Sequence, residues 1–115
     1  MSFLSDIKTI ILCAGLAVET SFFSENPPDT YAVITPMIDD LADYADDLPQ
    51  KEVCVARISV FTKSNYTSIK NSLTRAFLFA GWTITDRRYI EFDPKTGYHH
   101  YNIDVENVYE YEMEE

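Results

Sequence analysis

The most regular pattern of hydrophobic and polar positions lies in residues 51–108, where the period changes from two to that of a helix and back to two. The first segment, residues 51–63 (KEVCVARISVFTK), is rich in β-branched residues and predicts a strand that is covered on at least one face. Arg57 and Ser59 interrupt one face of this strand. The other face is the better candidate for the core, and it comprises Cys54, Ala56, Ile58 and Val60.

A helix is predicted between residues 64 and 81. Ser64 or Asn65 can cap its first turn, because a short side-chain oxygen accepts a hydrogen bond from a backbone N–H that has no other partner there. Gly81 can end the helix in the left-handed conformation that glycine tolerates. The helix is expected to pack on a sheet through one stripe, which comprises Ile69, Leu73, Ala76, Phe77 and Ala80.

A β-hairpin is predicted after this helix. The period of two returns in residues 82–92, and the residues expected on one face are Trp82, Ile84, Ile90 and Phe92. The turn DPKTG at residues 93–97 supplies a turn-starting aspartate, a proline of fixed φ and a glycine that can adopt positive φ. The flanking strands should therefore pair antiparallel. The apolar side of the last strand comprises Tyr101, Ile103 and Val105.

The N-terminal part of the chain adds one helix and two strands. Residues 4–14 carry apolar side chains at helical spacing, residues 16–23 form a short extended segment, and residues 31–37 (YAVITPM) predict a second strand. The predicted order of elements is α-β-β-β-α-β-β. It corresponds to one α+β domain over residues 1–115, in which two helices pack on a mostly antiparallel sheet.

An acidic segment, residues 38–50 (IDDLADYADDLPQ), lies between the second and third predicted strands. Aspartate is a poor residue inside a helix and Pro49 would stop one, so we expect a long acidic loop. The segment lacks the glycine and the final glutamate of an EF-hand loop, and a specific calcium site is not expected. The tail at residues 109–115 alternates aromatic and acidic residues, and it can extend the last strand or fray.

Acidic residues outnumber basic residues by 19 to 9, which gives a formal net charge of −10. This balance argues against a nucleic-acid binder, which needs cations to displace counterions from phosphate, and against binding to anionic membranes. We expect Cys13 and Cys54 to be free, buried thiols in a reducing compartment. The first residues lack the basic leader of a signal peptide and no span has the length of a transmembrane helix, so a cytosolic product is expected.

The sequence carries no recognisable catalytic motif. It contains no G-x-S-x-G elbow, P-loop, G-x-G-x-x-G or H-E-x-x-H. His99 and His100 are adjacent, and adjacent residues of a strand point to opposite faces, so the two imidazoles cannot chelate one metal ion. We therefore predict neither an enzyme nor a cofactor or metal site.

The strand, helix and hairpin patterns described above lie mainly in three stretches, ARISVFTKSNY, AFLFAGWTITD and DPKTGYHHYNIDV. Together with the TYAVI strand, the acidic segment and the order of elements, they resemble the tail terminator (tail completion) proteins of long-tailed bacteriophages and prophages. The resemblance covers nearly the whole chain. It implies a ring, usually a hexamer, that sits on the finished tail tube, stops its polymerisation and offers its upper face to the head-completion proteins. DNA would pass through the ring, which would be assembled in the host cytoplasm and lie in the neck of the virion tail.

The resemblance suggests roles for two sets of residues. Carboxylates that face the lumen of a ring would repel DNA phosphates, so that the duplex slides without sticking. The candidates for this lining are Asp39, Asp40, Asp43, Asp46 and Asp47, and the other interpretation is a solvated loop that serves solubility alone. Subunits of like charge also need apolar and aromatic contacts. The candidate anchors to subunits or partners are Tyr89, Tyr98, Tyr109 and Tyr111, although each tyrosine can instead cover its own sheet.

Three other functions stay open from the sequence. The first is another head–tail connector, such as a stopper protein, because the order of elements separates these proteins poorly. The second is a monomeric acidic module that mimics nucleic acid or engages a basic partner, and self-assembly of the purified chain would count against it. The third is a hydrolase with an unrecognised site, which would require a deep pocket with clustered titratable groups.

Overall fold

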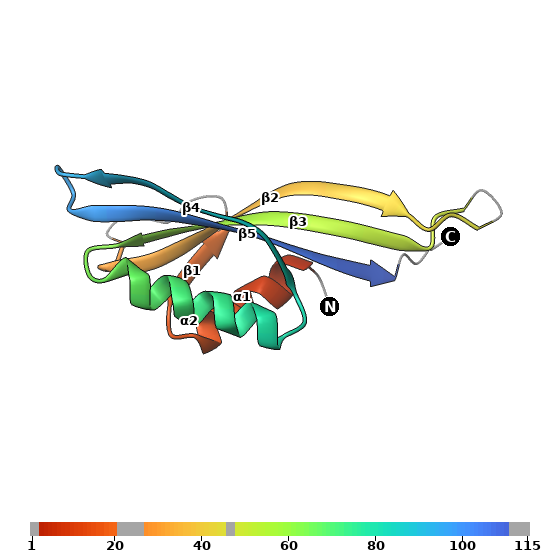
Figure 1. Cartoon of the computed structure of the whole chain (residues 1–115), viewed down its shortest axis with the longest axis horizontal. Coiled ribbons are helices and arrows are strands. Elements are labelled where there is room, and N and C mark those ends of the chain that lie inside the picture. Colours follow the sequence, from red (N-terminus) through yellow and green to blue (C-terminus); the bar gives the residue numbers. More distant parts are fainter. Residues whose placement is uncertain (1–2, 21–26, 46–47, 111–115) are drawn as a thin grey trace.

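The computed structural model describes residues 3–20, 27–45 and 48–110. Within these residues it has two helices and a five-stranded sheet in the predicted order α-β-β-β-α-β-β (Figure 1). This confirms the predicted α+β fold. The helices are α1 (Phe3–Cys13) and α2 (Tyr66–Phe79), and the strands are β1 (Ala17–Thr20), β2 (Thr30–Ala42), β3 (Lys51–Thr62), β4 (Thr83–Asp93) and β5 (Tyr98–Glu110).

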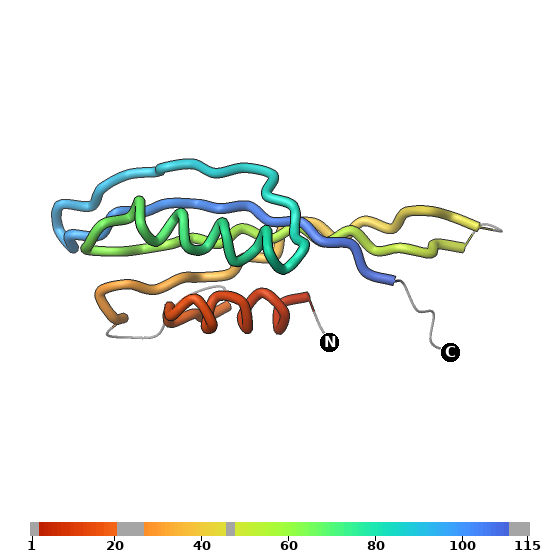
Figure 2. The backbone as a smooth tube through the Cα atoms, turned by 60° about the horizontal axis from the view of Figure 1, so that its bottom comes forward, coloured from red at the N-terminus to blue at the C-terminus, as the bar shows by residue number. Residues whose placement is uncertain are grey.

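The strands follow the order β1-β2-β3-β5-β4 across the sheet. β1 runs parallel to β2, and the other neighbouring strands are antiparallel, including the predicted hairpin of β4 and β5. α2 connects β3 to β4 and passes over β5, which lies between them. Figure 1 and Figure 2 show both helices on the same side of the sheet, so the described helices cover one of its two faces.

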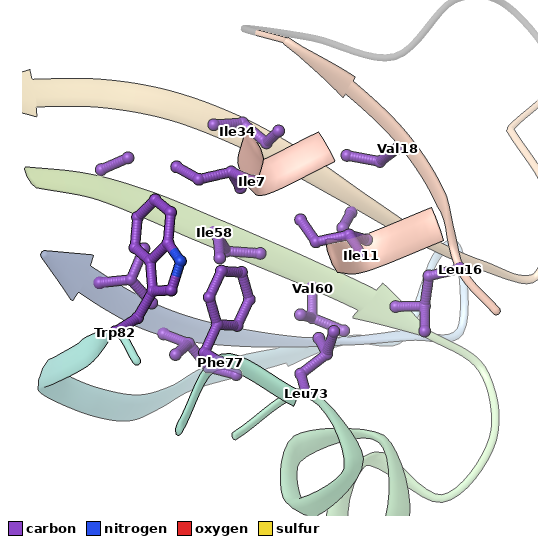
Figure 3. Packing of buried hydrophobic residues seen from close by; sticks show 14 of the residues in the cluster. Ile7, Ile11, Leu16, Val18, Ile34, Ile58, Val60, Leu73, Phe77 and Trp82 are labelled. Atoms are coloured by element: carbon purple, nitrogen blue, oxygen red, sulfur yellow. The ribbon is translucent and has the colours of Figure 1, made fainter. Parts of the chain in front are cut away.

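The core forms where the helices meet the sheet (Figure 3). α1 contributes Ile7 and Ile11, and α2 contributes Leu73 and Phe77, all of them fully buried. The face of β3 that was predicted for the core is buried, and so are the core-facing residues of its neighbouring strands β2 and β5. The sheet residues of the core on β2, β3 and β5 are Ala32, Ile34, Ala56, Ile58, Val60, Tyr101, Ile103 and Val105. Each fully buried large aliphatic side chain contributes about 1.5–3 kcal/mol of transfer free energy.

The two ends of α2 are formed as the sequence predicts. At the first turn, the side-chain oxygen of Asn65 accepts a hydrogen bond from the backbone N–H of Thr67 at 3.0 Å. At the other end Gly81 has a φ of +87°, in the left-handed region. The backbone N–H of Trp82 then donates to the carbonyl of Phe77 at 2.9 Å, and this turn directs the indole back onto the core.

The alternation of side chains along β4 differs from the prediction. The sequence predicts that Ile84 and Ile90 share one face, but the register of β4 against β5 shifts after Ile84 and again after Tyr89. Each shift places one extra residue in β4, so the first reverses the alternation and the second restores it. Tyr89 therefore lies opposite Tyr101 on the helix-covered face, and Ile90 lies exposed in the second bulge.

Phe77 and Phe79 provide a matched test of the core, because they lie two positions apart in α2. Phe77 is 0% exposed and Phe79 is 84% exposed. We expect Phe77→Ala to lower the free energy of unfolding by about 3–5 kcal/mol, since it removes a buried ring and leaves a cavity. Phe79→Ala should change it by less than about 0.5 kcal/mol. Urea denaturation followed by circular dichroism measures both values, and equal losses would contradict the packing of α2 through Phe77.

Candidate functional site

A β-hairpin that projects beyond the helices is the most prominent feature of the surface (Figure 1). We name residues 37–45 and 48–55 the hairpin arm. In the arm, the end of β2 pairs with the beginning of β3 as far as Ala42 and Lys51. Farther out, Ala45 and Leu48 exchange backbone hydrogen bonds of 2.8 and 2.9 Å. The arm makes the molecule elongated, with extents of 55 × 26 × 23 Å.

The acidic loop predicted for residues 38–50 is shorter than expected. Residues 38–42 continue β2 and pair with residues 51–55 of β3, so the prediction of a loop is wrong for this part. Aspartate is depleted in strands, but the whole range of strand preferences spans only about 1 kcal/mol. Backbone pairing with the apolar start of β3 overrides a preference of that size.

The aspartates predicted to line a lumen do not share one face of the arm. Asp39 lies opposite Cys54 and Asp40 lies opposite Val53, so their side chains point to opposite faces. Asp43 follows the strand with a φ of +53°, a left-handed conformation that aspartate tolerates in turns. The two other candidates, Asp46 and Asp47, lie outside the described residues. One surface can therefore be lined by Asp39 or by Asp40, but not by both.

The arm also exposes large apolar side chains. Tyr44, near the tip, is 62% exposed. Val108 of β5 lies beside the arm, opposite Val53, and is exposed as well. The exposed apolar residues of the arm within the described part of the chain are Met37, Ile38, Leu41, Tyr44 and Leu48. Such a concentration of apolar groups on a projecting segment is typical of a surface that contacts another protein.

A group of three possible metal ligands lies at the base of the arm. The ligand atoms of Asp39, Glu52 and Cys54 lie within 4.8 Å of one another. Burial, a hydrogen bond with Asp39 and the charge of Glu52 raise the pKa of Cys54 to about 12, so the thiol is protonated at neutral pH. Because the thiolate is the form that binds metal ions, an ion bound here would have to displace this proton.

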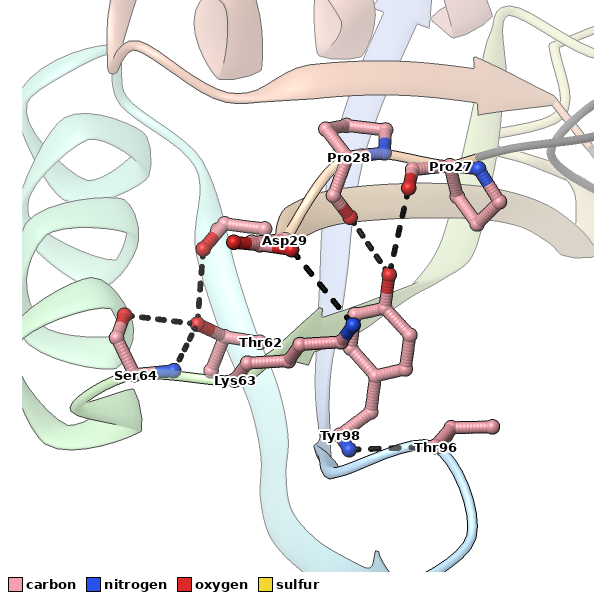
Figure 4. A network of polar contacts seen from close by, with 9 residues as sticks. Pro27, Pro28, Asp29, Thr62, Lys63, Ser64, Thr96 and Tyr98 are labelled. Carbon is pink, nitrogen blue, oxygen red and sulfur yellow. Dashed lines mark hydrogen bonds and ion pairs between the residues drawn. The ribbon is translucent and has the colours of Figure 1, made fainter.

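Two of the predicted aromatic anchors, Tyr98 and Tyr109, make contacts within the chain. The hydroxyl of Tyr98 donates to the carbonyl of Pro28 at 2.7 Å, and the ammonium of Lys63 lies 4.9 Å from the centre of its ring (Figure 4). Tyr98 thereby joins β5 to the segment before β2. The hydroxyl of Tyr109 donates to the carboxylate of Asp6 at 2.6 Å and joins β5 to α1. Burial and this hydrogen bond raise the pKa of Tyr109.

Tyr89 is the exposed member of the described candidate anchors, on the edge strand β4. Its hydroxyl lies 3.0 Å from Nδ1 of His99, and its ring centre lies 5.0 Å from that of Tyr66 in α2. One side of the ring is therefore packed within the chain while the rest stays accessible to a partner. Tyr111 lies outside the described residues.

The face of the sheet opposite the helices carries an aromatic pocket of about 300 Å³. The ring of Phe61 stacks on those of Tyr31 and His100, at centre-to-centre distances of 5.0 and 4.3 Å. His100 and His99 lie on opposite faces, as predicted for neighbours in a strand. Burial lowers the pKa of His100, so that its imidazole is neutral at neutral pH. Two acidic side chains also line the pocket, Glu91 and Asp93.

A second hollow, of about 360 Å³, lies between α1 and α2. We name it the interhelix groove. Its lining includes Ile10, Cys13, Ala14, Arg75, Ala76 and Phe79. Leu12 and Leu78, which neighbour lining residues in the two helices, are also exposed. The groove is thus bordered by apolar side chains that nothing in the described part of the chain covers.

Cys13 is exposed, and the prediction that it is buried was wrong. The buried stripe of α1 runs through Ile7 and Ile11, and a residue two positions beyond Ile11 points to the opposite side of the helix. Sequence reasoning also missed the groove itself. The available signal was Leu78 and Phe79, two large apolar residues that lie off the predicted core stripe of α2.

None of the helices in the described part of the chain is long and apolar enough to cross a membrane. Neither a comparison with protein-family models nor a search of curated proteins finds a match to this chain. The hairpin arm, the aromatic pocket and the interhelix groove are therefore the features on which a functional proposal has to rest.

The two cysteines should differ in reactivity. Cys13 is exposed, whereas Cys54 is buried and has a raised pKa. At about pH 8, a disulfide reagent such as dithionitrobenzoate should modify one thiol per chain quickly and the second at least about tenfold more slowly, because the thiolate is the nucleophile. Cys13→Ser should abolish the fast phase, and Cys54→Ser should leave it unchanged. Two equally fast thiols would contradict the burial of Cys54.

Proposed function

We propose that this chain is a structural protein of bacteriophage assembly, a ring-forming tail terminator. It would cap the tail tube, stop its polymerisation and join it to the head-completion proteins, in the neck of a virion assembled in the host cytoplasm. The observation that most supports the proposal is the hairpin arm, which extends from a helix-covered body (Figure 1). The arm exposes large apolar side chains. Such a surface is unfavourable in water and is suited to a subunit whose neighbours cover it. The resemblance of the sequence to tail terminators supports the same function.

The edges of the sheet are consistent with a subunit that ends a polymer. Exposed strand edges can pair with other chains, and short edge strands, bulges and charged residues limit such pairing. β1 has four residues. β4 carries two bulges and a series of charged residues, which are Asp86, Arg87, Arg88, Glu91 and Asp93. These features limit the addition of strands at β1 and β4, whereas the outer side of β2 from Thr35 to Ala42 has no paired strand in the described part of the chain.

The acidic residues would serve the passage of DNA. A duplex that moves through a ring is held by positive charge and repelled by negative charge, and these forces act over a Debye length of about 8 Å at physiological salt. Because Asp39 and Asp40 point to opposite faces of the arm, a ring would place one of them toward the lumen. Asp43 lies in the turn after β2, where side chains do not alternate between two faces. It can therefore line the lumen together with Asp39 or with Asp40.

The aromatic pocket favours a second candidate function, a monomeric acidic module that binds a basic partner. Phe61 and Tyr98 line the pocket with aromatic rings whose faces are partly covered within the chain, and Glu91 and Asp93 supply negative charge beside them. A lysine or arginine side chain is the group that such a combination binds best. A further alternative is another structural protein that connects the head and the tail of the virion, such as a stopper protein.

Mixing the purified chain with the cognate tail-tube protein tests the proposed function. We expect rings of about six subunits in negative-stain images, a cap at one end of each tube, and tubes that become shorter as the chain is added in excess. Light scattering coupled to gel filtration measures the mass of the free and the tube-bound chain. A chain that stays monomeric and neither caps nor shortens tubes would contradict the terminator function and favour the acidic module.

Neutralising the acidic residues tests their role separately. The variant changes Asp39, Asp40, Asp46 and Asp47 to Asn and retains Asp43, which lies next to Tyr44. We expect it to fold and to cap tubes, but the assembled particles should lose at least about tenfold in infectivity because DNA is retained by a less repulsive lumen. The control variant, Glu19→Gln, removes an exposed acidic group of β1 away from the arm and should retain infectivity. Full infectivity of the first variant would contradict a role of these aspartates in ejection.

A further inference from the structure

The chain carries both a projecting apolar segment and an apolar hollow that this segment cannot reach. Figure 1 shows the hairpin arm pointing away from α1 and α2. The tip of the arm exposes Tyr44 and Leu48, and the interhelix groove is bordered by the exposed ring of Phe79. Two copies of the chain can cover both surfaces at once, if the tip of one copy enters the groove of the next.

We propose that the tip of the hairpin arm docks in the interhelix groove of a neighbouring copy of this chain. The inference rests on the ring-forming part of the proposed function and names the two surfaces that would join the subunits. The open groove has a volume of about 360 Å³, within the range of roughly 300–1,000 Å³ that is typical of pockets for ligand-sized groups. Tyr44, as the most exposed large apolar side chain of the arm, is the residue that enters it.

Charge favours the same pairing. The chain has a net charge of −10, so most contacts between two copies bring acidic groups together. Arg75 supplies a guanidinium to the lining of the groove, and Asp43 supplies a carboxylate next to Tyr44, with Asp46 and Asp47 following in the sequence. When the tip enters the groove, an acidic group meets a basic group, which favours this orientation over others.

The arrangement also accounts for a finite assembly. The tip and the groove are different surfaces, so each subunit donates one arm and receives another. Head-to-tail contacts of this kind close into a ring when the rotation between subunits permits it. In a closed ring every groove is filled and every tip is covered, and no apolar end remains to recruit further copies.

Native Cys13 lines the groove and allows a direct test by disulfide trapping. In Ala45→Cys, a thiol is placed at the tip while Tyr44 is retained. Mild oxidation with copper phenanthroline should join this thiol to Cys13 of the next subunit. We expect a ladder of covalent oligomers on a non-reducing gel, and the linked peptides identified by mass spectrometry. Adding Cys13→Ser should remove the ladder.

Two controls keep the experiment specific. Lys95→Cys places an equally available thiol in the turn between β4 and β5, and should give at least about tenfold less linkage to Cys13 because this turn has no matching surface. In the Ala45→Cys background, Phe79→Ser or Arg75→Glu should lower the yield at least about fivefold, as both alter the groove. Phe92→Ser, at a ring that is 47% exposed on β4, should leave the yield unchanged.

The outcomes separate this inference from the proposed function. Tubes that are capped by Ala45→Cys without any linkage to Cys13, over a wide range of protein concentrations, would overturn the docking of tip into groove while the terminator function stands. Disulfide-linked rings that fail to cap tubes would support the docking and contradict the terminator function. Equal linkage from Lys95→Cys and Ala45→Cys would show random collision and overturn the inference.

Discussion

The fold and the arm both depend on the pairing of β3 with β2 and with β5. Each of the 12 residues of β3 has a partner on both neighbouring strands, from Lys51 to Thr62. One half of the strand carries the core under the helices, and the other half forms one side of the arm. An isolated two-stranded hairpin is marginally stable in water, whereas a hairpin continuous with a larger sheet inherits its register and twist. The core therefore holds in place a surface that has little core of its own.

The proposed assembly of such an acidic chain would depend on the charges and apolar groups close to the joined surfaces. At physiological salt the Debye length is about 8 Å, far below the 55 Å length of the molecule. The total charge of a subunit thus matters less than the charges within a few ångströms of a contact. Apolar burial contributes roughly 25 cal/mol per Å² wherever the surfaces fit. A few exposed apolar groups beside one basic side chain can outweigh repulsion that is mostly screened.

Sequence reasoning predicted the elements whose signal is local. The stripe of Leu73 and Phe77, the Asn65 cap and the Gly81 stop all follow from spacing within α2, and the structure confirms them. Sequence reasoning failed where pairing with a distant strand determines the conformation of a segment. Residues 38–42 read as loop because aspartate disfavours regular structure, but their pairing with β3 is not visible in their own composition. The bulges of β4 likewise arise from its register with β5, and the groove from the placement of two helices far apart in sequence.

The face of the sheet opposite the helices has a polar centre, which limits where an apolar partner can contact it. Its centre holds Asp104, which is buried and accepts two hydrogen bonds from Arg57 at 2.9 and 3.1 Å. A buried carboxylate in a bidentate pair is costly to desolvate further, and an apolar partner laid over it would lose the water that still reaches the guanidinium. The centre of this face is therefore unfavourable for apolar contact, as is the charged and bulged edge at β4. In the proposed ring, contact is made instead by the tip of the arm and by the interhelix groove, and because the arm points away from α1 and α2, one subunit can contact two neighbours at once.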